Sequence, residues 1–426
     1  MKLQLAKGVQ DIAPQEKLLQ NKVIKIIKDE FESFGFAPLE TPIIERYETL
    51  AAKFGAGAGS DVLKETFKFE DQGKRKLGLR FELTTSLARF VAMNPTLKMP
   101  FKRYEMGPNF RDGPIKLGRS RQFWQCDCDT LGSNSMVCEA EQIAILSRVF
   151  RKLDFDFEIK INNRKILNGI LNQAGIKKQK DAIIAIDKLD KIGVKGVSQE
   201  LVDRGYSQKQ IDQVFKIIEM GVSVSSLKKK IKDEEGARGI VEIEELFDFL
   251  KKLGVNEIKY DVSLARGQAY YTGIVVEAFL KNSKITSSIA GGGRYDDMIG
   301  GFLGGGRVVP AVGVSFGIVP IMQALIERSE SLVKTPAQVL VIPLNTTLKS
   351  LEIANGLRAK GINVDFSLKK GVSKNLSYAN SLGIKFAIIV GEDEVKAKKV
   401  NLRDMKSGDE QKLSLLQAAK VIENAS

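Results

Sequence analysis

The sequence contains no histidine among its 426 residues. This absence excludes the Ser-His-Asp triad, the Cys-His pair, the HExxH zinc site and any histidine acting as a general base. Chemistry in this chain must therefore use carboxylates, arginines, tyrosines, a metal ion or the substrate itself.

Cysteines and long apolar runs are also scarce. Cys126, Cys128 and Cys138 lack the CxxC spacing and the fourth ligand of a zinc site, so buried free thiols are favoured and no metal ligand is assigned. No apolar run approaches the length of a membrane span, and the start, MKLQLAKGVQDIAP, is too polar for a secretion signal. We therefore expect a cytoplasmic protein that does not enter a membrane.

Basic residues, by contrast, are in excess, with a formal net charge of +14 at pH 7. Taken alone, this charge favours a lysine-rich solvated surface. The alternative is a polyanionic partner that is bound through counterion release. Few aromatic residues and no arginine-rich repeat argue against a stacking platform for single-stranded nucleic acid.

The glycine-rich stretches do not supply a nucleotide loop. GAGAGS at 55–60 lacks the preceding strand and following helix of a dinucleotide site. The glycines at 291–293 and 304–306 bracket a predicted tight-turn region, and neither group has the GxxxxGK[ST] pattern of a phosphate loop. A nucleotide would have to be held by other groups.

Apolar patterns place the main elements. They predict helices over 16–34, 84–93 and 136–153, strands over 155–162, 259–264 and 272–280, and a strand pair around the turn at 72–74. The stretch GFAPLETPIIE (35–45) is predicted to be a strand at an edge or interface, because prolines interrupt it.

The sequence pattern changes at two places and divides the chain. Residues 163 to about 252 predict a helical insertion with short breaks near Gly193 and Gly196, serving either as a solvated structural module or as an RNA contact. Lys334–Ala337 is a predicted linker that separates domains at 1–333 and 334–426. The second domain alternates strands and helices, which predicts a small α/β fold with a largely parallel sheet.

The stretch FRDGPIKLGRSRQFWQCDCD, from Phe110 to Asp129, is predicted to be a strand, a basic loop and a returning strand. Because side chains alternate along a strand, Phe123, Gln125, Asp127 and Asp129 share one face, and the two cysteines share the other. The polar, partly acidic face lies beside a cluster of cations. Such a surface could hold an amino-bearing substrate next to a polyphosphate.

Five segments together resemble the histidyl-tRNA synthetase family of class II aminoacyl-tRNA synthetases. They are GFAPLETPIIE (35–45, the first class motif), residues 110–129 (the second), LARGQAYYTG (264–273), AGGGRYDDMIG (290–300) and GEDEVKAKKVNLRDM (391–405). The insertion and FWQCDCD look closest to archaeal and eukaryotic members. The resemblance implies an α+β catalytic domain, with an antiparallel sheet flanked by helices and a helical insertion, and a C-terminal α/β anticodon-binding domain.

The implied activity is that of a homodimeric histidine–tRNA ligase. It would activate L-histidine with ATP and Mg²⁺ and transfer it to the 3′ end of tRNA(His). The attacking histidine carboxylate is already ionised at neutral pH, so no activating base is required. Catalysis can then rest on positioning and on arginines that bind oxyanions bidentately.

The resemblance also assigns roles to individual residues. The catalytic pair would be Arg111, on the ATP α-phosphate, and Arg266, bridging that phosphate and the histidine carboxylate, while Arg119 would bind the nucleotide. Histidine would be bound by Glu82, Leu83, Thr84 and Gln125 around the α-amino side and by Asp129, Tyr270 and Tyr271 around the imidazole. Plainer alternatives are a helix-start cap for Glu82 and Thr84, core packing for the tyrosines and a surface ion pair for Arg266.

One motif departs from the family pattern. The third class motif normally ends in an acid and an arginine that contacts the γ-phosphate, but this chain has Val319 and Pro320. The departure leaves open a non-charging paralogue, such as a histidine-binding regulatory subunit of ATP phosphoribosyltransferase. One interpretation of the missing histidines is that the chain can be translated when charged histidyl-tRNA is scarce.

Overall fold

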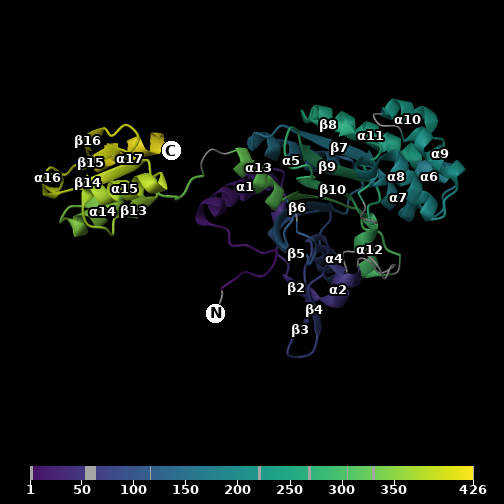
Figure 1. The fold of residues 1–426 in the computed structure, drawn as a ribbon, viewed down its shortest axis with the longest axis horizontal. Helices are drawn as coiled ribbons and strands as arrows, with labels where there is room; N and C mark the ends of the chain where they lie inside the picture. The colour runs from purple at the N-terminus through teal and green to yellow at the C-terminus, as the bar shows by residue number, and fades with distance from the viewer. Residues whose placement is uncertain are drawn as a thin grey trace. The chain divides into compact units, whose positions relative to one another are not determined.

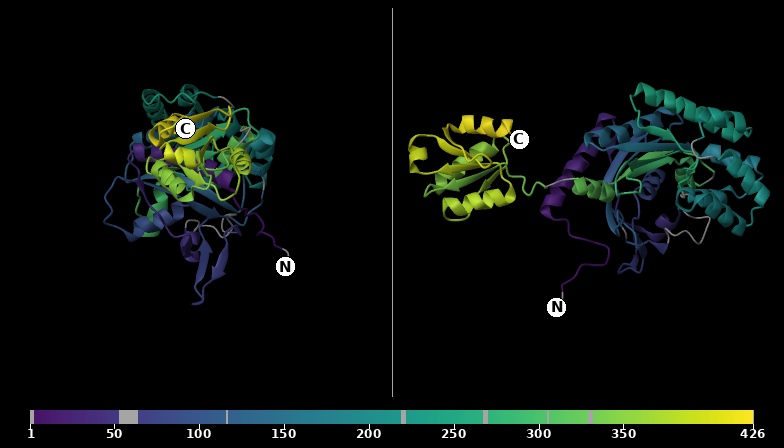
Figure 2. Two further views of the ribbon diagram at one scale, coloured as in Figure 1. Left: turned by 90° about the vertical axis from the view of Figure 1, so that its left-hand side faces the viewer. Right: turned by 45° about the horizontal axis from the view of Figure 1, so that its top comes forward.

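The structure is a computed structural model, and Figures 1 and 2 show its course. It describes residues 3–52, 64–115, 117–218, 222–266, 270–304, 306–328 and 332–425. The stretch at 55–60 and the middle of LARGQAYYTG therefore lie outside the described residues. The described residues form two compact units, the larger ending at Arg328 and the smaller built mainly from residue 332 onward.

An eight-stranded sheet forms the centre of the larger unit (Figure 1). Its spatial order is β1 (Ala37–Pro38), β5 (Phe101–Phe110), β6 (Gln122–Leu131), β11 (Ala311–Gly317), β10 (Ala290–Arg294), β9 (Ile274–Leu280), β7 (Phe157–Asn163) and β8 (Ile258–Tyr260). The inner pairings are antiparallel, and the outermost pairings, β1 with β5 and β7 with β8, are parallel. The predicted antiparallel sheet is confirmed at its centre, while the sheet as a whole is mixed.

The proline-containing stretch 35–45 supplies two short strands rather than the single predicted one. β1 lies at the edge of the large sheet, where the missing N–H group of Pro38 leaves no ladder bond unmade. β2 (Ile44–Arg46) pairs with β4 (Lys76–Leu79), which pairs with β3 (Lys68–Glu70) in a separate antiparallel sheet. The predicted pair around 72–74 is confirmed as β3 and β4.

Helices α1 (Pro14–Ser33) and α5 (Val137–Lys152) cover one face of the large sheet. The rings of Phe31 on α1 and Phe150 on α5 lie 5.9 Å and 5.5 Å from the ring of Phe316 on β11. Cys126 is paired with Phe316 in the strand register and shares this covered face. All three cysteines are buried free thiols, as predicted.

The opposite face of the sheet is only partly covered. Helices α4 (Thr84–Met93) and α12 (Asp296–Leu303) pack there around Leu131 of β6. Because residues alternate along β6, Gln125, Asp127 and Asp129 point to this face. The partial cover leaves room for a cavity above them.

The described residues between β7 and β8 fold as helices and confirm the predicted helical insertion. The helices are α6 (Arg164–Gln173), α7 (Gln179–Ile186), α8 (Leu189–Asp203), α9 (Gln208–Ile217), α10 (Val224–Lys230) and α11 (Glu234–Lys252). Gly193 interrupts α8 with a φ of 66°, where the sequence predicts a break, whereas Gly196 lies within the continuing helix, so the break predicted there was wrong.

The glycines at 291–293 form strand β10 and helix α12 (Asp296–Leu303) follows it, so the tight-turn region predicted between the two glycine groups was wrong. A Cβ atom at Gly292 would lie 2.0 Å from the Gly313 carbonyl oxygen, and one at Gly291 would lie 2.1 Å from Nη1 of Arg266. Glycine is required here by the close approach of neighbouring groups and not by a chain reversal. Helix α12 follows β10 and ends before Gly304.

The smaller unit contains a five-stranded sheet between helices. Its order is β13 (Val364–Phe366), β12 (Val339–Pro343), β14 (Phe386–Val390), β15 (Val400–Asp404) and β16 (Glu410–Leu413), with helices α14 (Thr347–Arg358), α15 (Val372–Leu382), α16 (Glu392–Lys396) and α17 (Leu415–Asn424). Alternate residues of β12 belong to two apolar clusters on the two faces, which explains its continuous apolar sequence. The first three strands are parallel, but β15 and β16 are antiparallel, so the predicted parallel sheet was right only in part.

Among the described helices, none combines the length and the apolar character that crossing a bilayer requires.

Candidate active site

A cavity of about 380 Å³ lies on the sheet face that carries Gln125 and Asp129. It is lined by all but one of the residues that the sequence assigned to the site: Glu82, Thr84, Arg111, Arg119, Gln125, Asp129, Arg266, Tyr270 and Tyr271. The exception is Leu83, whose side chain is fully buried and is not part of the lining. The fold thus brings together segments that are far apart in the sequence.

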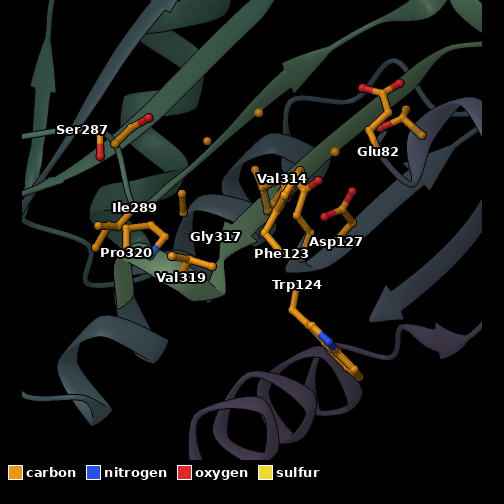
Figure 3. A pocket seen from close by; sticks show the side chains of 18 of the residues that line it. Glu82, Phe123, Trp124, Asp127, Ser287, Ile289, Val314, Gly317, Val319 and Pro320 are labelled. Atoms are coloured by element: carbon orange, nitrogen blue, oxygen red, sulfur yellow. The ribbon is translucent and has the colours of Figure 1, made fainter. Parts of the chain in front are cut away.

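The two ends of the cavity differ in chemistry. Figure 3 shows Ile289, Val319 and Pro320 together at one end, and Glu82 and Asp127 toward the other. The acidic end offers acceptors for a cationic ligand. The other end carries apolar side chains where the family pattern has an acid and an arginine.

Three rows of side chains cross the sheet beneath the acidic end. The strand register aligns Asp129 with Arg103 and Gly313, and it aligns Asp127 with Glu105 and Ser315. In the third row, Gln125 lies opposite Gly107 and Gly317. Directly opposite residues of neighbouring strands are close enough to interact, so each row is a contact group.

A buried chain of ion pairs supports Asp129. Arg103 is fully buried, and its Nη2 lies 2.7 Å from Oδ2 of Asp129 and its Nη1 3.6 Å from Oε2 of Glu105. Arg80 continues the chain with an Nη1–Oε1 distance of 2.8 Å to Glu105. The backbone N–H of Thr41 donates to the same oxygen at 2.9 Å, which ties the first-motif segment to the site.

Asp129 is held on both sides. The Tyr295 hydroxyl donates a hydrogen bond to Oδ1, opposite the contact with Arg103. A Cβ atom at Gly313 would lie 1.9 Å from Oδ1, so only glycine leaves room for this carboxylate. Burial raises the pKa of Asp129, and Arg103 and the Tyr295 hydrogen bond oppose that increase.

Asp127 is a cavity-lining carboxylate to which the sequence analysis gave no role. The alternation of side chains already placed it on the polar face, and this was the available signal. Its side chain is 5% exposed, and burial raises its pKa to about 7. Arg103 opposes this increase, whereas Asp129 and Glu82 reinforce it.

The Arg266 side chain lies against β10, close to Gly291. Its Nη1 donates to the Val276 carbonyl oxygen at 2.9 Å, and its guanidinium carbon is 5.3 Å from the centre of the Tyr271 ring. The backbone of Arg266 has a φ of 45°, a left-handed conformation that costs free energy in a non-glycine residue. Nε of Arg266 lies 3.7 Å from Oε1 of Glu277, so this arginine does form an ion pair, but its side chain is 17% exposed and lines the cavity rather than the outer surface.

Arg111 lies where β5 ends, as predicted. Its Nε donates to the Phe81 carbonyl oxygen at 3.1 Å, and its guanidinium lies 4.9 Å from the centre of the Phe123 ring. Burial lowers the pKa of Arg111, the nearby Glu82 raises it and Arg119 lowers it. Arg119 is more exposed and forms an ion pair of 2.9 Å with Glu65.

The plainer alternatives were a helix-start cap for Glu82 and Thr84 and core packing for the two tyrosines. The observed contacts test both. Helix α4 begins after Leu83 without a side-chain cap, and the Thr85 hydroxyl donates to Glu82 at 2.7 Å. Thr84 therefore does not cap this helix. Tyr270 and Tyr271 have ring centroids 4.6 Å apart and contact both the apolar core and the cavity, so the packing and binding interpretations hold together.

The third-motif segment contributes its apolar residues to the cavity. Helix α13 (Ile318–Arg328) begins at the position to which the sequence limits it, with Pro320 in its first turn. Val319 and Pro320 both line the cavity. Arg111, Arg119 and Arg266 are therefore the arginines of the lining available to an anionic ligand.

The arrangement suits the joining of a cationic, carboxylate-bearing molecule to a polyphosphate. Carboxylates at one end can hold an ammonium group, and the arginines can hold a carboxylate and phosphates side by side. Among the described residues, no group of three or more Asp, Glu or Cys side chains could hold a metal ion.

Two family models match this chain. The model described as histidyl-tRNA synthetase matches residues 8–321, and the model described as anticodon binding domain matches residues 338–425. The chain is 42% identical to histidine–tRNA ligase 1 of Bacillus cereus over 422 residues, which cover 97% of this chain and 98% of that protein.

Solved structures show the same likeness. The histidyl-tRNA synthetase of Nostoc sp. PCC 7120 matches with 31% identity, a TM-score of 0.88 and full coverage of both chains. A Bacillus halodurans protein, described as an ATP phosphoribosyltransferase regulatory subunit/histidyl-tRNA synthetase, matches with 20% identity and a TM-score of 0.75 over 89% of this chain and 97% of that one. At this lower identity the likeness concerns the fold alone. These relatives are bacterial, which does not support the expected closeness to archaeal and eukaryotic members.

Proposed function

The chain belongs to the histidyl-tRNA synthetase family and is a histidine–tRNA ligase, and we propose that the cavity around Gln125 and Arg266 is its active site. The enzyme activates L-histidine with ATP to histidyl-adenylate and transfers it to the 3′ end of tRNA(His). One observation supports this site. Apart from Leu83, the residues implied by the family pattern all line one cavity.

We propose that two arginines carry the first step. The histidine carboxylate attacks the α-phosphorus of ATP, a P–O bond forms, and diphosphate leaves with the electrons of the broken bond. Arg266 holds the carboxylate and the α-phosphate together, and Arg111 binds the same phosphate. Both are partly buried and fixed by carbonyl or ring contacts, so little reorganisation accompanies the reaction.

Histidine is selected at the other end. In this proposal Glu82, Thr84 and Gln125 bind the α-amino group, and Asp129, Tyr270 and Tyr271 surround the imidazole. An amino acid without ring nitrogens would leave buried polar groups unpaired, which discriminates strongly against it. The contacts of Arg103 and Tyr295 hold the Asp129 carboxylate in place for this role.

The binding of ATP depends on contacts other than those of the third class motif. We propose that Arg119 binds ATP after leaving Glu65, and that Mg²⁺ would accompany the nucleotide. Mg²⁺ commonly keeps several waters and uses one or two carboxylates plus phosphates, so it does not need a dedicated cluster of protein ligands. The ion would neutralise phosphate charge in place of the missing arginine.

Further features of the proposal concern assembly and location. We propose a cytoplasmic homodimer in which the first-motif segment with β1 lies at the interface. We also propose a domain boundary at the linker Lys334–Ala337, with the insertion spanning 163 to about 252. The smaller unit would contact the anticodon, supported by the match of residues 338–425 to the anticodon binding domain.

The alternative of a regulatory paralogue is disfavoured. Such paralogues usually lack the anticodon domain, whereas this chain contains a complete five-stranded unit that matches it. Charging of tRNA(His) with labelled histidine, in a series of salt concentrations, tests the function. Charging with tRNA binding that weakens steeply as salt increases supports the ligase, and histidine binding without tRNA binding supports the regulator.

A further inference from the structure

Asp127 is the carboxylate that the buried ion pairs leave uncompensated. The chain of ion pairs uses two cations, Arg80 and Arg103, and two carboxylates, Glu105 and Asp129. Asp127 is a third carboxylate in the neighbouring row of side chains, opposite Glu105, and it is almost completely buried. An unpaired buried charge is costly, so this position is expected either to hold a proton or to receive a cation.

One oxygen of Asp127 lacks a hydrogen-bond partner in the part of the chain that the structure describes, and the carboxylate must rotate to present it to the cavity that the residue lines. Oδ1 is buried and has no hydrogen-bond partner within the described residues. Asp129, by contrast, has the Tyr295 hydroxyl at one oxygen and Arg103 at the other. Asp127 lines the cavity, and Figure 3 shows its carboxylate on the cavity side of β6 while Trp124 points away.

We propose that Asp127 is a further histidine-binding residue, whose carboxylate accepts a hydrogen bond from the α-ammonium group of the substrate. This inference rests on the proposed function, because it adds a contact to the same pocket. Asp127 lies on β6 between Gln125, assigned to the amino side, and Asp129, assigned to the imidazole side. The ammonium is cationic throughout the neutral range, whereas the imidazole is mostly neutral at pH 8.

The surroundings of Asp127 couple histidine binding to its protonation. The groups that face it are Arg103 and Glu105 from β5, Asp129 from β6, Ser315 from β11, Tyr295 after β10, and Glu82 before α4, while the neighbouring thiols of Cys126 and Cys128 lie on the other face of β6. Burial raises the pKa of Asp127 to about 7, and an ammonium group beside the carboxylate would lower it. Below pH 7 the binding of histidine would therefore release a proton, and affinity would increase as the pH rises.

The test compares histidine binding by wild type, Asp127→Asn and Cys126→Ala, measured by calorimetry at pH 6 and pH 8. Asn keeps the shape and removes the charge, and we expect affinity at pH 8 to fall about 10- to 100-fold, as for the loss of one hydrogen bond to a charged group. At pH 6, where Asp127 is largely protonated, the difference should be smaller. Cys126 lies on the covered face of the same strand and serves as the matched control, with unchanged affinity expected.

Two analogues identify the group that Asp127 contacts. Histidinol keeps the ammonium and imidazole groups, and imidazolepropionate lacks the ammonium. Asp127→Asn should weaken the binding of histidinol as strongly as that of histidine and leave imidazolepropionate within about twofold of wild type. An equal loss for imidazolepropionate would assign Asp127 to the ring and overturn the proposal, as would unchanged histidine affinity.

The experiment distinguishes a failure of this inference from a failure of the proposed function. If wild type activates histidine and Asp127→Asn binds it equally well, the inference fails and the function stands. If wild type neither binds nor activates histidine, the proposed function itself fails. Unfolding curves of all three proteins at both pH values identify any loss caused by misfolding, and Asp127→Glu, which keeps the charge, should retain the pH dependence of binding.

Discussion

The burial of Asp127 predicts a measurable effect on stability that is independent of substrate. The side chain is 5% exposed, and its pKa is raised from 3.8 to about 7. The folded protein therefore keeps a proton between about pH 4 and pH 7 that the unfolded chain has released. Folding binds the proton in this window, so the stability contributed by protonated Asp127 is lost as the pH rises toward 7.

The size of the effect follows from the same pKa difference. Across the whole window it corresponds to roughly 4 kcal/mol of unfolding free energy. Asp127→Asn removes the titrating group, so it should become more stable relative to wild type by roughly 2–3 kcal/mol between pH 5 and pH 8. Comparison with wild type at each pH cancels the titration of the carboxylates that do not interact with Asp127, whereas Asp129 and Glu82 are coupled to it.

Urea denaturation followed by tryptophan fluorescence measures this difference. Trp124 is the single tryptophan of the chain and lies on the same strand as Asp127, so its emission reports on the larger unit. A stability difference between the two proteins that does not change with pH would refute the reasoning. A less stable variant at pH 8 would show that the charge of Asp127 is compensated in the folded state.

Three other substitutions test the site. Arg266→Lys removes the planar fork and should lower kcat for adenylate formation about 10²- to 10³-fold with a smaller change in the KM for histidine, as measured by pyrophosphate exchange. Glu65→Gln removes the ion pair with Arg119 and should lower the KM for ATP by up to about fivefold, and an unchanged KM would argue against Arg119 as a nucleotide contact. Gly313→Ala would place a Cβ atom 1.9 Å from Asp129, so the KM for histidine should increase at least about tenfold while the KM for ATP stays constant.

Elements with regular patterns could be predicted from the sequence. The helix over 84–93 and the strands around 110–129 depend on local periodicity, and the structure places them there. The glycines at 291–293 were misassigned because a turn and a crowded central strand both favour glycine. Only the neighbouring strands, which lie far away in sequence, decide between the two.

The site could be predicted in part for a similar reason. The alternation of side chains along β6 predicts that Gln125, Asp127 and Asp129 share one face, and all three line the cavity. Periodicity could not show that Arg103 and Tyr295 occupy the oxygens of Asp129 while Oδ1 of Asp127 has no partner within the described residues. Those contacts come from other strands, and they separate the two carboxylates chemically.

Given the activity, the absence of histidine has a consequence for the synthesis of the enzyme. Translation of these 426 residues consumes no histidyl-tRNA, the product of the enzyme itself. Synthesis of the enzyme therefore does not depend directly on its own output. The chemistry tolerates the absence because the carboxylate nucleophile needs no general base and the arginines supply charge stabilisation.

Histidine-dependent ATP–pyrophosphate exchange with Mg²⁺ tests most directly whether this cavity forms the adenylate. The account predicts exchange above background that requires L-histidine, despite Val319 and Pro320 in the third class motif. Clear binding of histidine by calorimetry together with no exchange would contradict it, because the pocket would then recognise its substrate without performing the reaction.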